Sequence, residues 1–324
     1  MYGHGAVQRG PYGAVNAQDI VYADPTMNGP SGHGKSPFVP GQRRRLNVVA
    51  VVIALFVPWA IFTVGFATMS FSLRYTQPGL VLFLMSVMFI IVTIFGACAF
   101  DAARKKAKGH PAREPTWFIF LFITSLLAWG LGVGGGDSNY RINMETFYNF
   151  NNLNTYSSVD PQTTRGQQLM DAGRVLFVEG SRLDVTKSIG FKNLNTFCVA
   201  PVTRGTSDLV LYDFWAVGKD CCSGNKPDYH CGHFNSPGAI AGLRLMEDAD
   251  RAFYRLAVQQ AEAVYGIKAD HPLFFEWLED PIAQINGYQE TGFKYFLLGI
   301  LTYFSFQLFL VVVAAIAFSK MGFF

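Results

Sequence analysis

The chain has 324 residues, of which 50% are hydrophobic and only 15% are charged. This composition is too apolar for an ordinary soluble protein of this size, and it favours a membrane protein. The formal net charge of +3 is small, but the charges are distributed unevenly along the chain.

The N-terminal segment, residues 1–45, is rich in Gly, Pro and small polar residues and has little aliphatic periodicity. Such a segment does not offer enough apolar surface to form a core, so we expect a disordered cytosolic tail. It contains YGAV (12–15), which matches a short pattern that clathrin adaptors bind. Whether the tail carries a sorting signal is left open.

Four apolar runs follow the tail, at 46–71, 80–100, 117–133 and 293–318. Each has about 17–25 residues almost free of charge, and about 20 such residues in a helix cross a bilayer core of about 30 Å. We therefore predict an α-helical membrane protein with four transmembrane helices. Helices 1–3 with short loops occupy 46–136, a large exoplasmic domain occupies 137–292, and helix 4 with a short cytosolic C-terminus occupies 293–324.

The orientation follows from the positive residues near the ends of the spans. They gather before the first span, between the second and third, and after the fourth: Arg43, Arg44, Arg45, Arg104, Lys105, Lys106, Lys108, Arg113 and Lys320. Segment 137–292 instead holds 13 Lys and Arg against 19 Asp and Glu, a net charge of −6. We expect a multi-pass protein of the plasma membrane or an endomembrane, with both termini in the cytosol and the acidic segment on the exoplasmic side.

The exoplasmic segment contains four of the five cysteines: Cys198, Cys221, Cys222 and Cys231. An even number in an oxidising compartment predicts two disulfides. Adjacent cysteines bond to each other only with severe strain, so Cys221 and Cys222 take separate partners. Two pairings remain open: Cys198–Cys221 with Cys222–Cys231, or Cys198–Cys222 with Cys221–Cys231. The alternative is a zinc site that adds His230 and His233, although zinc ligands are usually spaced differently.

The exoplasmic segment is predicted to be a disulfide-bonded α+β domain. Its β-branched and aromatic residues over 173–222 predict a small antiparallel sheet. In 240–265 the apolar positions recur every three or four residues, which predicts an amphipathic helix packed on that sheet. The stripe that we expect to face the sheet ends with Leu256, Gln260 and Val264.

The segment HPLFFEWLEDP (271–281) is predicted to be a short aromatic-rich helix that Pro281 ends. Its aromatic side chains lie close to the fourth span in the sequence. Phe274, Phe275 and Trp277 therefore either rest at the lipid interface or close the core of the domain itself.

Inside the spans, three features stand out. Pro58 predicts a kink in the first span. The glycines of WGLGVGGG (129–136) would let another helix approach closely. The overlapping segment GGGDS (134–138), at the end of the third span, predicts a flexible exit from the membrane. Gln307 is strongly polar and lies deep in the fourth span, where we expect it to hydrogen-bond a neighbouring helix.

The sequence contains no motif that a known catalytic mechanism demands. The spans also lack the buried carboxylates, histidines and basic ladders of proton pumps and voltage sensors. We therefore predict no catalytic residues, no cofactor, no resident metal and no nucleic-acid binding.

Two resemblances to known families rest on particular residues. The layout is similar to that of tetraspanins, and CCSG (221–224) resembles their Cys-Cys-Gly motif with Ser223 inserted. A second set of segments resembles a multicopy family of four-span membrane proteins from dinoflagellate algae: NLNTYSSVDP, GQQLMDAGR, DVTKSIGFKNLNTFCVAPV, YDFWAVGKDCCSG and FYRLAVQQAEAVYGIKADHPLFFEWLEDP. This resemblance covers most of 150–281 and continues into the last span. It implies a four-span architecture and no particular activity.

These features together predict a non-enzymatic, tetraspanin-like membrane scaffold. Its expected partners are membrane lipids and other membrane proteins that bind the exoplasmic domain, and self-association into a homo-oligomer is left open. One alternative is an accessory subunit of a larger complex such as a channel, a transporter or a photosynthetic assembly. Another is a metal-dependent enzyme that uses the Cys/His cluster.

Overall fold

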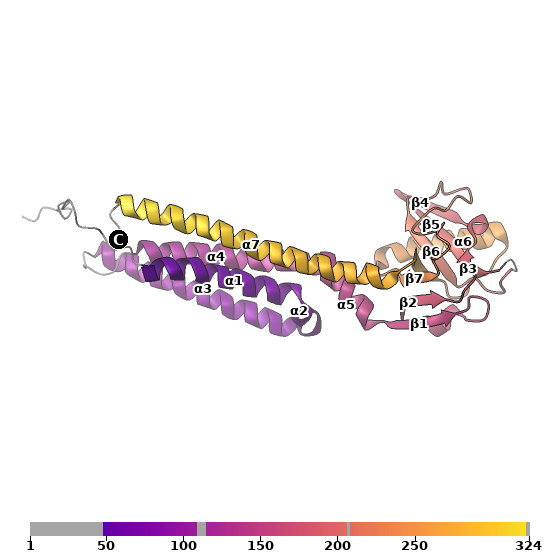
Figure 1. Cartoon of the computed structure of the whole chain (residues 1–324), viewed down its shortest axis with the longest axis horizontal. Coiled ribbons are helices and arrows are strands. Elements are labelled where there is room, and N and C mark those ends of the chain that lie inside the picture. The colour runs from indigo at the N-terminus through magenta and orange to yellow at the C-terminus, as the bar shows by residue number, and fades with distance from the viewer. Residues whose placement is uncertain (1–47, 109–114, 206–207, 322–324) are drawn as a thin grey trace, which may run out of the picture. The chain divides into compact units, whose positions relative to one another are not determined.

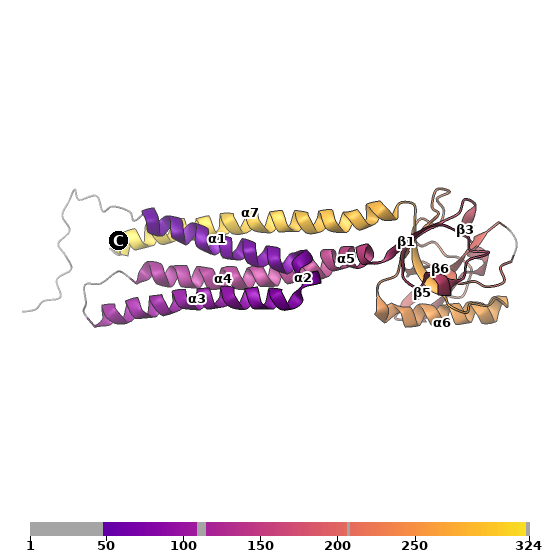
Figure 2. The same cartoon turned by 90° about the horizontal axis from the view of Figure 1, so that it is seen from below.

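The computed structural model describes residues 48–108, 115–205 and 208–321. Within these ranges, four helices are long and apolar enough to cross a membrane. They are α1 (Val48–Ser70), α3 (Pro78–Ala107), α4 (Thr116–Asn139) and α7 (Pro281–Met321), with the short α2 (Ser72–Thr76) between α1 and α3. The helices run side by side in a bundle (Figures 1 and 2). The prediction of four apolar helices is confirmed, whereas the predicted tail 1–45, with its YGAV pattern and triple arginine, lies outside the described residues.

Glycines of α4 allow α1 to pack closely against it. A Cβ on Gly132 would lie 2.9 Å from the Phe62 carbonyl oxygen, and one on Gly136 would lie 2.6 Å from the Cβ of Met69. Two small residues one turn apart are a common feature of tight helix pairs in membranes. The close approach predicted at 129–136 is therefore present, and it occurs within the chain.

The third span continues beyond its glycines, contrary to the prediction of a flexible exit. A π-helical turn (Tyr140–Met144) follows α4, and α5 (Glu145–Asn152) follows the turn, so 116–152 is helical throughout. Packing of Gly136 against α1 holds this segment in the helix. A helix of 37 residues is about 55 Å long, which exceeds the bilayer core of about 30 Å.

Residues between α5 and α7 form an eight-stranded mixed sheet. Its order is β1-β2-β7-β8-β6-β5-β3, and β4 also pairs with β5. The pairs β1–β2 and β6–β8 are parallel, and the other pairs are antiparallel. The strands are β1 (Asn154–Val159), β2 (Ala172–Phe177), β3 (Ser181–Leu183), β4 (Ile189–Asn193), β5 (Asn195–Arg204), β6 (Phe214–Lys219), β7 (Ala241–Arg244) and β8 (Leu273–Leu278).

The sheet is larger than the antiparallel sheet predicted over 173–222. The predicted short helix at 271–281 is wrong, because Leu273–Leu278 forms strand β8 between β6 and β7. The helix predicted over 240–265 begins later, as α6 (Asp248–Tyr265), and Ala241–Arg244 is strand β7. Two short 3₁₀ helices, Gly166–Leu169 and Val185–Lys187, complete the domain's secondary structure.

The helix α6 covers one side of the sheet (Figure 2), as predicted, but with a different face inward. Tyr254, Ala257, Val258 and Ala261 are buried against the sheet. The predicted inner residues Leu256, Gln260 and Val264 are exposed. Small alanines next to Tyr254 let the helix lie close to the strands, and this outweighs burial of the larger Leu256 and Val264.

The other side of the sheet has its own core, which contains Phe177, Phe214, Phe275 and Trp277. The loop between β6 and β7 adds Tyr229, Cys231 and Ala239 to this core. Phe274 packs on the α6 side. Of the two alternatives for these aromatic residues, the domain's own core is therefore the one observed.

Candidate functional site

Four cysteines of the sheet domain lie where β5 and β6 meet the loop that follows β6. Cys198 in β5 bonds to Cys222, with 5.9 Å between their Cα atoms. Cys221 bonds to Cys231, with 5.2 Å between their Cα atoms. Both separations are ordinary for a disulfide, and the pairing is the second of the two that the sequence left open.

Two glycines make room for these bridges on neighbouring strands. A Cβ on Gly190 of β4 would lie 2.7 Å from the sulfur of Cys222, and one on Gly218 of β6 would lie 2.6 Å from the sulfur of Cys231. Any larger residue would displace a sulfur. Both glycines are therefore part of the cysteine site, although their spacing in the sequence gave no sign of it.

A zinc site at these cysteines would require free thiolates as ligands. The sulfurs of Cys198, Cys221 and Cys231 lie within 4.8 Å of one another, but each belongs to a disulfide and so offers no thiolate for a metal. The Nδ1–H of His230 donates to the Asp228 carbonyl at 2.9 Å. The Nδ1 of His233 accepts from the backbone N–H of Glu279 at 3.1 Å.

A hairpin tip beside the disulfides exposes a large apolar side chain. Asn193 at the end of β4 pairs with Asn195 at the start of β5, so that Leu194 alone makes the turn. Its backbone is in the left-handed region, with φ of 60°, and its side chain is 98% exposed. A left-handed conformation costs an ordinary L-residue about 1–2 kcal/mol, and glycine or asparagine would avoid much of this.

The tip is held in place on the side of β6. The backbone N–H of Thr196 donates to the carboxylate of Asp220, and the N–H of Asp220 donates to the carbonyl of Thr196, each at 2.8 Å. The Cys198–Cys222 bridge lies two residues further along β5. Leu194 is thus presented on a cross-linked support.

Charges near the tip come from the exposed Lys192 of β4, from β6 and from the start of α6. The ammonium group of Lys219 lies 2.5 Å from Asp250 and 3.3 Å from Glu247. The hydrogen bond to Asp250 raises the pKa of Lys219 above its ordinary value, so this lysine stays protonated and paired. With Lys192 counted, three carboxylates near the tip outnumber two lysines: Asp220, Glu247 and Asp250 against Lys192 and Lys219.

The buried carboxylate of Asp213, elsewhere in the domain, has a structural role. Asp213, 3% exposed, accepts hydrogen bonds from the backbone N–H groups of Gly166, Asp270 and His271 at 2.9, 3.1 and 3.1 Å. These bonds fasten two loops to the start of β6. Because the carboxylate accepts from three backbone donors, it has a structural explanation.

Within the bundle, Gln307 of α7 is fully buried and its amide donates to the Ala54 carbonyl of α1 at 2.7 Å. This confirms the expected bond to a neighbouring helix. One turn earlier, Tyr303 stacks on Phe62 with 4.2 Å between ring centroids and donates to the carbonyl of Thr124 at 3.3 Å. These contacts join α7 to α1 and α4.

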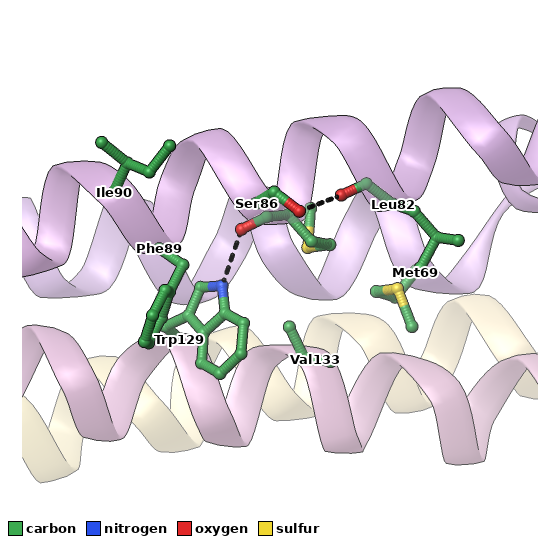
Figure 3. Close-up of a pocket in the computed structure, with 8 residues that line it drawn as sticks. Met69, Leu82, Ser86, Phe89, Ile90, Trp129 and Val133 are labelled. Carbon is green, nitrogen blue, oxygen red and sulfur yellow. Dashed lines mark hydrogen bonds between the residues drawn. The ribbon is translucent and has the colours of Figure 1, made fainter.

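An apolar groove of about 480 Å³ lies along the bundle between α3 and α4, with Met69 of α1 at one end (Figure 3). The indole of Trp129 donates to the Met85 carbonyl at 3.2 Å and packs against Phe89, with 4.9 Å between the ring centroids. The hydroxyl of Ser86 donates to the Leu82 carbonyl at 2.8 Å. The groove is lined by Met69, Leu82, Met85, Ser86, Phe89, Ile90, Trp129 and Val133.

Comparisons with protein-family models, curated proteins and solved structures return no match to this chain. The resemblances drawn from the sequence therefore stay predictions.

The sequence reasoning identified the cysteines and Gln307 but missed Leu194 and the groove. One signal was available for Leu194, because NLN lies between two runs rich in aromatic and β-branched residues and is typical of a hairpin turn. No comparable signal marks the groove, since its residues are ordinary for a membrane-spanning helix.

Proposed function

We propose that the protein is a non-enzymatic integral membrane scaffold that uses its exoplasmic domain to bind other proteins. The observation that supports this most is the hairpin tip. Leu194 is almost fully exposed in an unfavourable backbone conformation on a disulfide-linked support. A rigid apolar side chain of this kind is suited to fill a pocket of a partner, where its burial contributes about 1.5–3 kcal/mol.

The proposed orientation rests on the distribution of charge. The basic residues lie between α3 and α4 and near the ends of the chain, whereas the domain between α4 and α7 carries the net charge of −6. The rule that positive loops stay in the cytosol then places this domain on the exoplasmic side. An oxidising compartment on that side also agrees with the two disulfides.

The chemistry of the tip indicates the kind of partner. We expect a protein surface with a small apolar pocket for Leu194 and a positively charged rim, because carboxylates predominate near the tip. Complementary charge of this kind mainly speeds encounter and selects the partner, while the buried side chain contributes most of the affinity.

The test compares two substitutions of exposed leucines. Glycine adopts the left-handed conformation readily, so Leu194→Gly keeps the turn and removes the apolar contact, and unlike asparagine it creates no Asn-x-Thr glycosylation acceptor with Thr196. Leu256→Ala, on the exposed face of α6, is the matched control, because it also removes a leucine side chain and favours the helix. Complexes are trapped in native membranes with a membrane-impermeant cross-linker and resolved after mild solubilisation on a native gel.

Wild type and Leu256→Ala should give the same discrete complex, and Leu194→Gly should lose it. A complex that survives in all three proteins, or a wild type that migrates alone, contradicts the proposal. Protease added to sealed vesicles whose exoplasmic face is outward checks the orientation separately, because it should cleave the domain and spare the cytosolic segment at 101–115.

A further inference from the structure

The groove between α3 and α4 has only two polar side chains in its lining, and both are already bonded. The indole N–H of Trp129 and the hydroxyl of Ser86 both donate to backbone carbonyls of α3. The other lining side chains are apolar. An occupant therefore gains nothing from a hydroxyl or an amide of its own, and a hydrocarbon suits the groove best.

The groove lies in the outer half of the proposed membrane region. From Leu82 to Ile90 it follows eight residues of α3, or about 12 Å, and α3 begins only four residues before Leu82, at Pro78. Half of a hydrocarbon core is about 15 Å thick. The length of the groove therefore matches one leaflet, the leaflet on the side of the sheet domain.

A charged group marks the outer end of the groove. The guanidinium of Arg74 contacts the sulfur of Met69 at 3.5 Å, pairs with Asp137, and lies 4.7 Å from the ring centroid of Tyr140. Such a cluster belongs at the level of the lipid headgroups. The groove thus opens inward from the membrane interface along the direction of a lipid tail.

The lining has one side chain that is held rigidly, Trp129, and two flexible ones, Met69 and Met85. Trp129 is held by its hydrogen bond and by Phe89, while Met69 and Met85 are unbranched and can adjust to a flexible occupant. The volume of about 480 Å³ is within the usual range of about 300–1,000 Å³ for ligand pockets.

We propose that this groove is a binding site for one acyl chain of a phospholipid from the exoplasmic leaflet. The inference rests on the membrane insertion assumed in the proposed function, but not on the role of Leu194. A sterol would fill the groove with a rigid ring system, whereas the unbranched Met69 and Met85 suit a flexible chain. A helix of another protein is too wide for a groove of this volume and could insert only a side chain.

The experiment uses the full-length protein in phosphatidylcholine vesicles with a trace of phosphatidylcholine that carries a photoreactive diazirine in the middle of one acyl chain. Flotation of the vesicles first shows that the protein is inserted. Adducts are then mapped by mass spectrometry. They should concentrate on Met85, Phe89 and Val133 and be several-fold rarer at Ile94 and Leu131, which are 53% and 52% exposed outside the groove.

Filling the groove provides the matched variant. Val133→Trp should abolish the enrichment on the remaining lining residues, whereas Leu131→Trp on the same helix should leave it unchanged. Leu194→Gly should also leave it unchanged, so that failure of the scaffold proposal is distinguished from failure of this one. The wild-type map needs no variant and remains decisive if Val133→Trp does not fold.

Three outcomes would overturn the proposal. Adducts spread evenly over lining and non-lining residues would show boundary lipid only. Preferential labelling of the groove by a diazirine sterol, with loss of the phospholipid adducts in competition, would assign it to a sterol. Absence of adducts from the lining residues, with labelling retained at Ile94 and Leu131, would show that another protein chain covers the groove.

Discussion

Gln307 on α7 supplies the hydrogen-bond donor that Pro58 removes from α1. In a regular helix the carbonyl of Ala54 would accept from the backbone N–H four residues later, but residue 58 is a proline and has no such group. The amide of Gln307 donates to that carbonyl at 2.7 Å. In hydrocarbon an unpaired carbonyl is costly, so this bond explains why a glutamine is tolerated deep in the fourth span.

The first prediction tests this relationship by a double-mutant cycle. In wild type, Gln307→Leu should destabilise the bundle because it leaves the Ala54 carbonyl unpaired. In a Pro58→Ala background, where residue 58 has its own N–H, the same change should cost little or nothing. The coupling should be about 0.6–1.7 kcal/mol, measured by reversible unfolding in detergent micelles. Equal effects in both backgrounds would disprove the relationship.

The glycines of α4 give the second prediction. Gly136→Ala should destabilise the bundle by about 1–3 kcal/mol through overpacking, because its Cβ would meet Met69 and the Phe66 carbonyl. Gly134→Ala is the control, since nothing lies within 4 Å of its Cβ position, and it should be neutral or slightly stabilising because alanine favours helix. Thermal unfolding in detergent measures the difference in stability between the Gly136→Ala and Gly134→Ala variants. A harmless Gly136→Ala would mean that α1 and α4 do not pack this closely.

The third prediction concerns the disulfide pairing. Partial reduction with stepwise alkylation, followed by tandem mass spectrometry that resolves the adjacent Cys221 and Cys222, should find Cys198 joined to Cys222 and Cys221 joined to Cys231. Removing the first bridge with Cys198→Ala and Cys222→Ala should lower stability by about 2–4 kcal/mol, whereas Cys98→Ala, a free cysteine in α3, should leave the sheet domain unchanged. Peptides that join Cys198 to Cys221 would refute the pairing.

The fourth prediction is a loss of stability in acid that depends on Asp184. Burial raises the pKa of this carboxyl, but hydrogen bonds from Thr186 and Lys187 outweigh burial and leave the pKa below its ordinary value. A group whose pKa falls on folding stabilises the folded state above its unfolded pKa, here about 3.9, and loses this contribution as the pH falls. Asp184→Asn should therefore lower stability by about 1 kcal/mol near neutral pH and by less near pH 3.

Lys187, the partner of Asp184, titrates at the other end of the pH scale. Hydrogen bonds to Asp208 and Asp184 raise the pKa of Lys187, so its contribution is complete below its unfolded pKa of about 10.4 and is lost only in stronger base. Unfolding monitored from pH 3 to 9 checks the prediction, with the exposed Asp248→Asn as control. An Asp184→Asn deficit that does not shrink in acid would show that the ion pair is not its cause.

Some features of this protein were readable from the sequence because they depend on local composition. Hydropathy located the four long helices, since each run is apolar over the length that a bilayer requires. The cysteine count and the strain of bonding adjacent residues reduced the pairings to two. The polarity of Gln307 inside an apolar run indicated a bond to another helix, because a lone amide in hydrocarbon needs a partner.

Other features depended on contacts between residues far apart in the chain. Leu273–Leu278 has aromatic residues that are compatible with either a helix or a strand. It forms a strand because its backbone pairs with both β6 and β7. The inward face of α6 was decided by how closely Ala257 and Ala261 let it approach the sheet.

Composition, charge and residue type were enough to predict four helices long and apolar enough to cross a membrane, the uneven charge and the cross-linkable cysteines, because these are local properties. The three-dimensional structure was needed to show that Cys198 bonds to Cys222, that Gln307 donates to the carbonyl that Pro58 leaves unpaired, and that Leu194 is exposed at a hairpin tip. The first two depend on the register of strands or helices that are distant in sequence, and the third depends on the register of the neighbouring strands β4 and β5. Register is determined by packing across the whole fold.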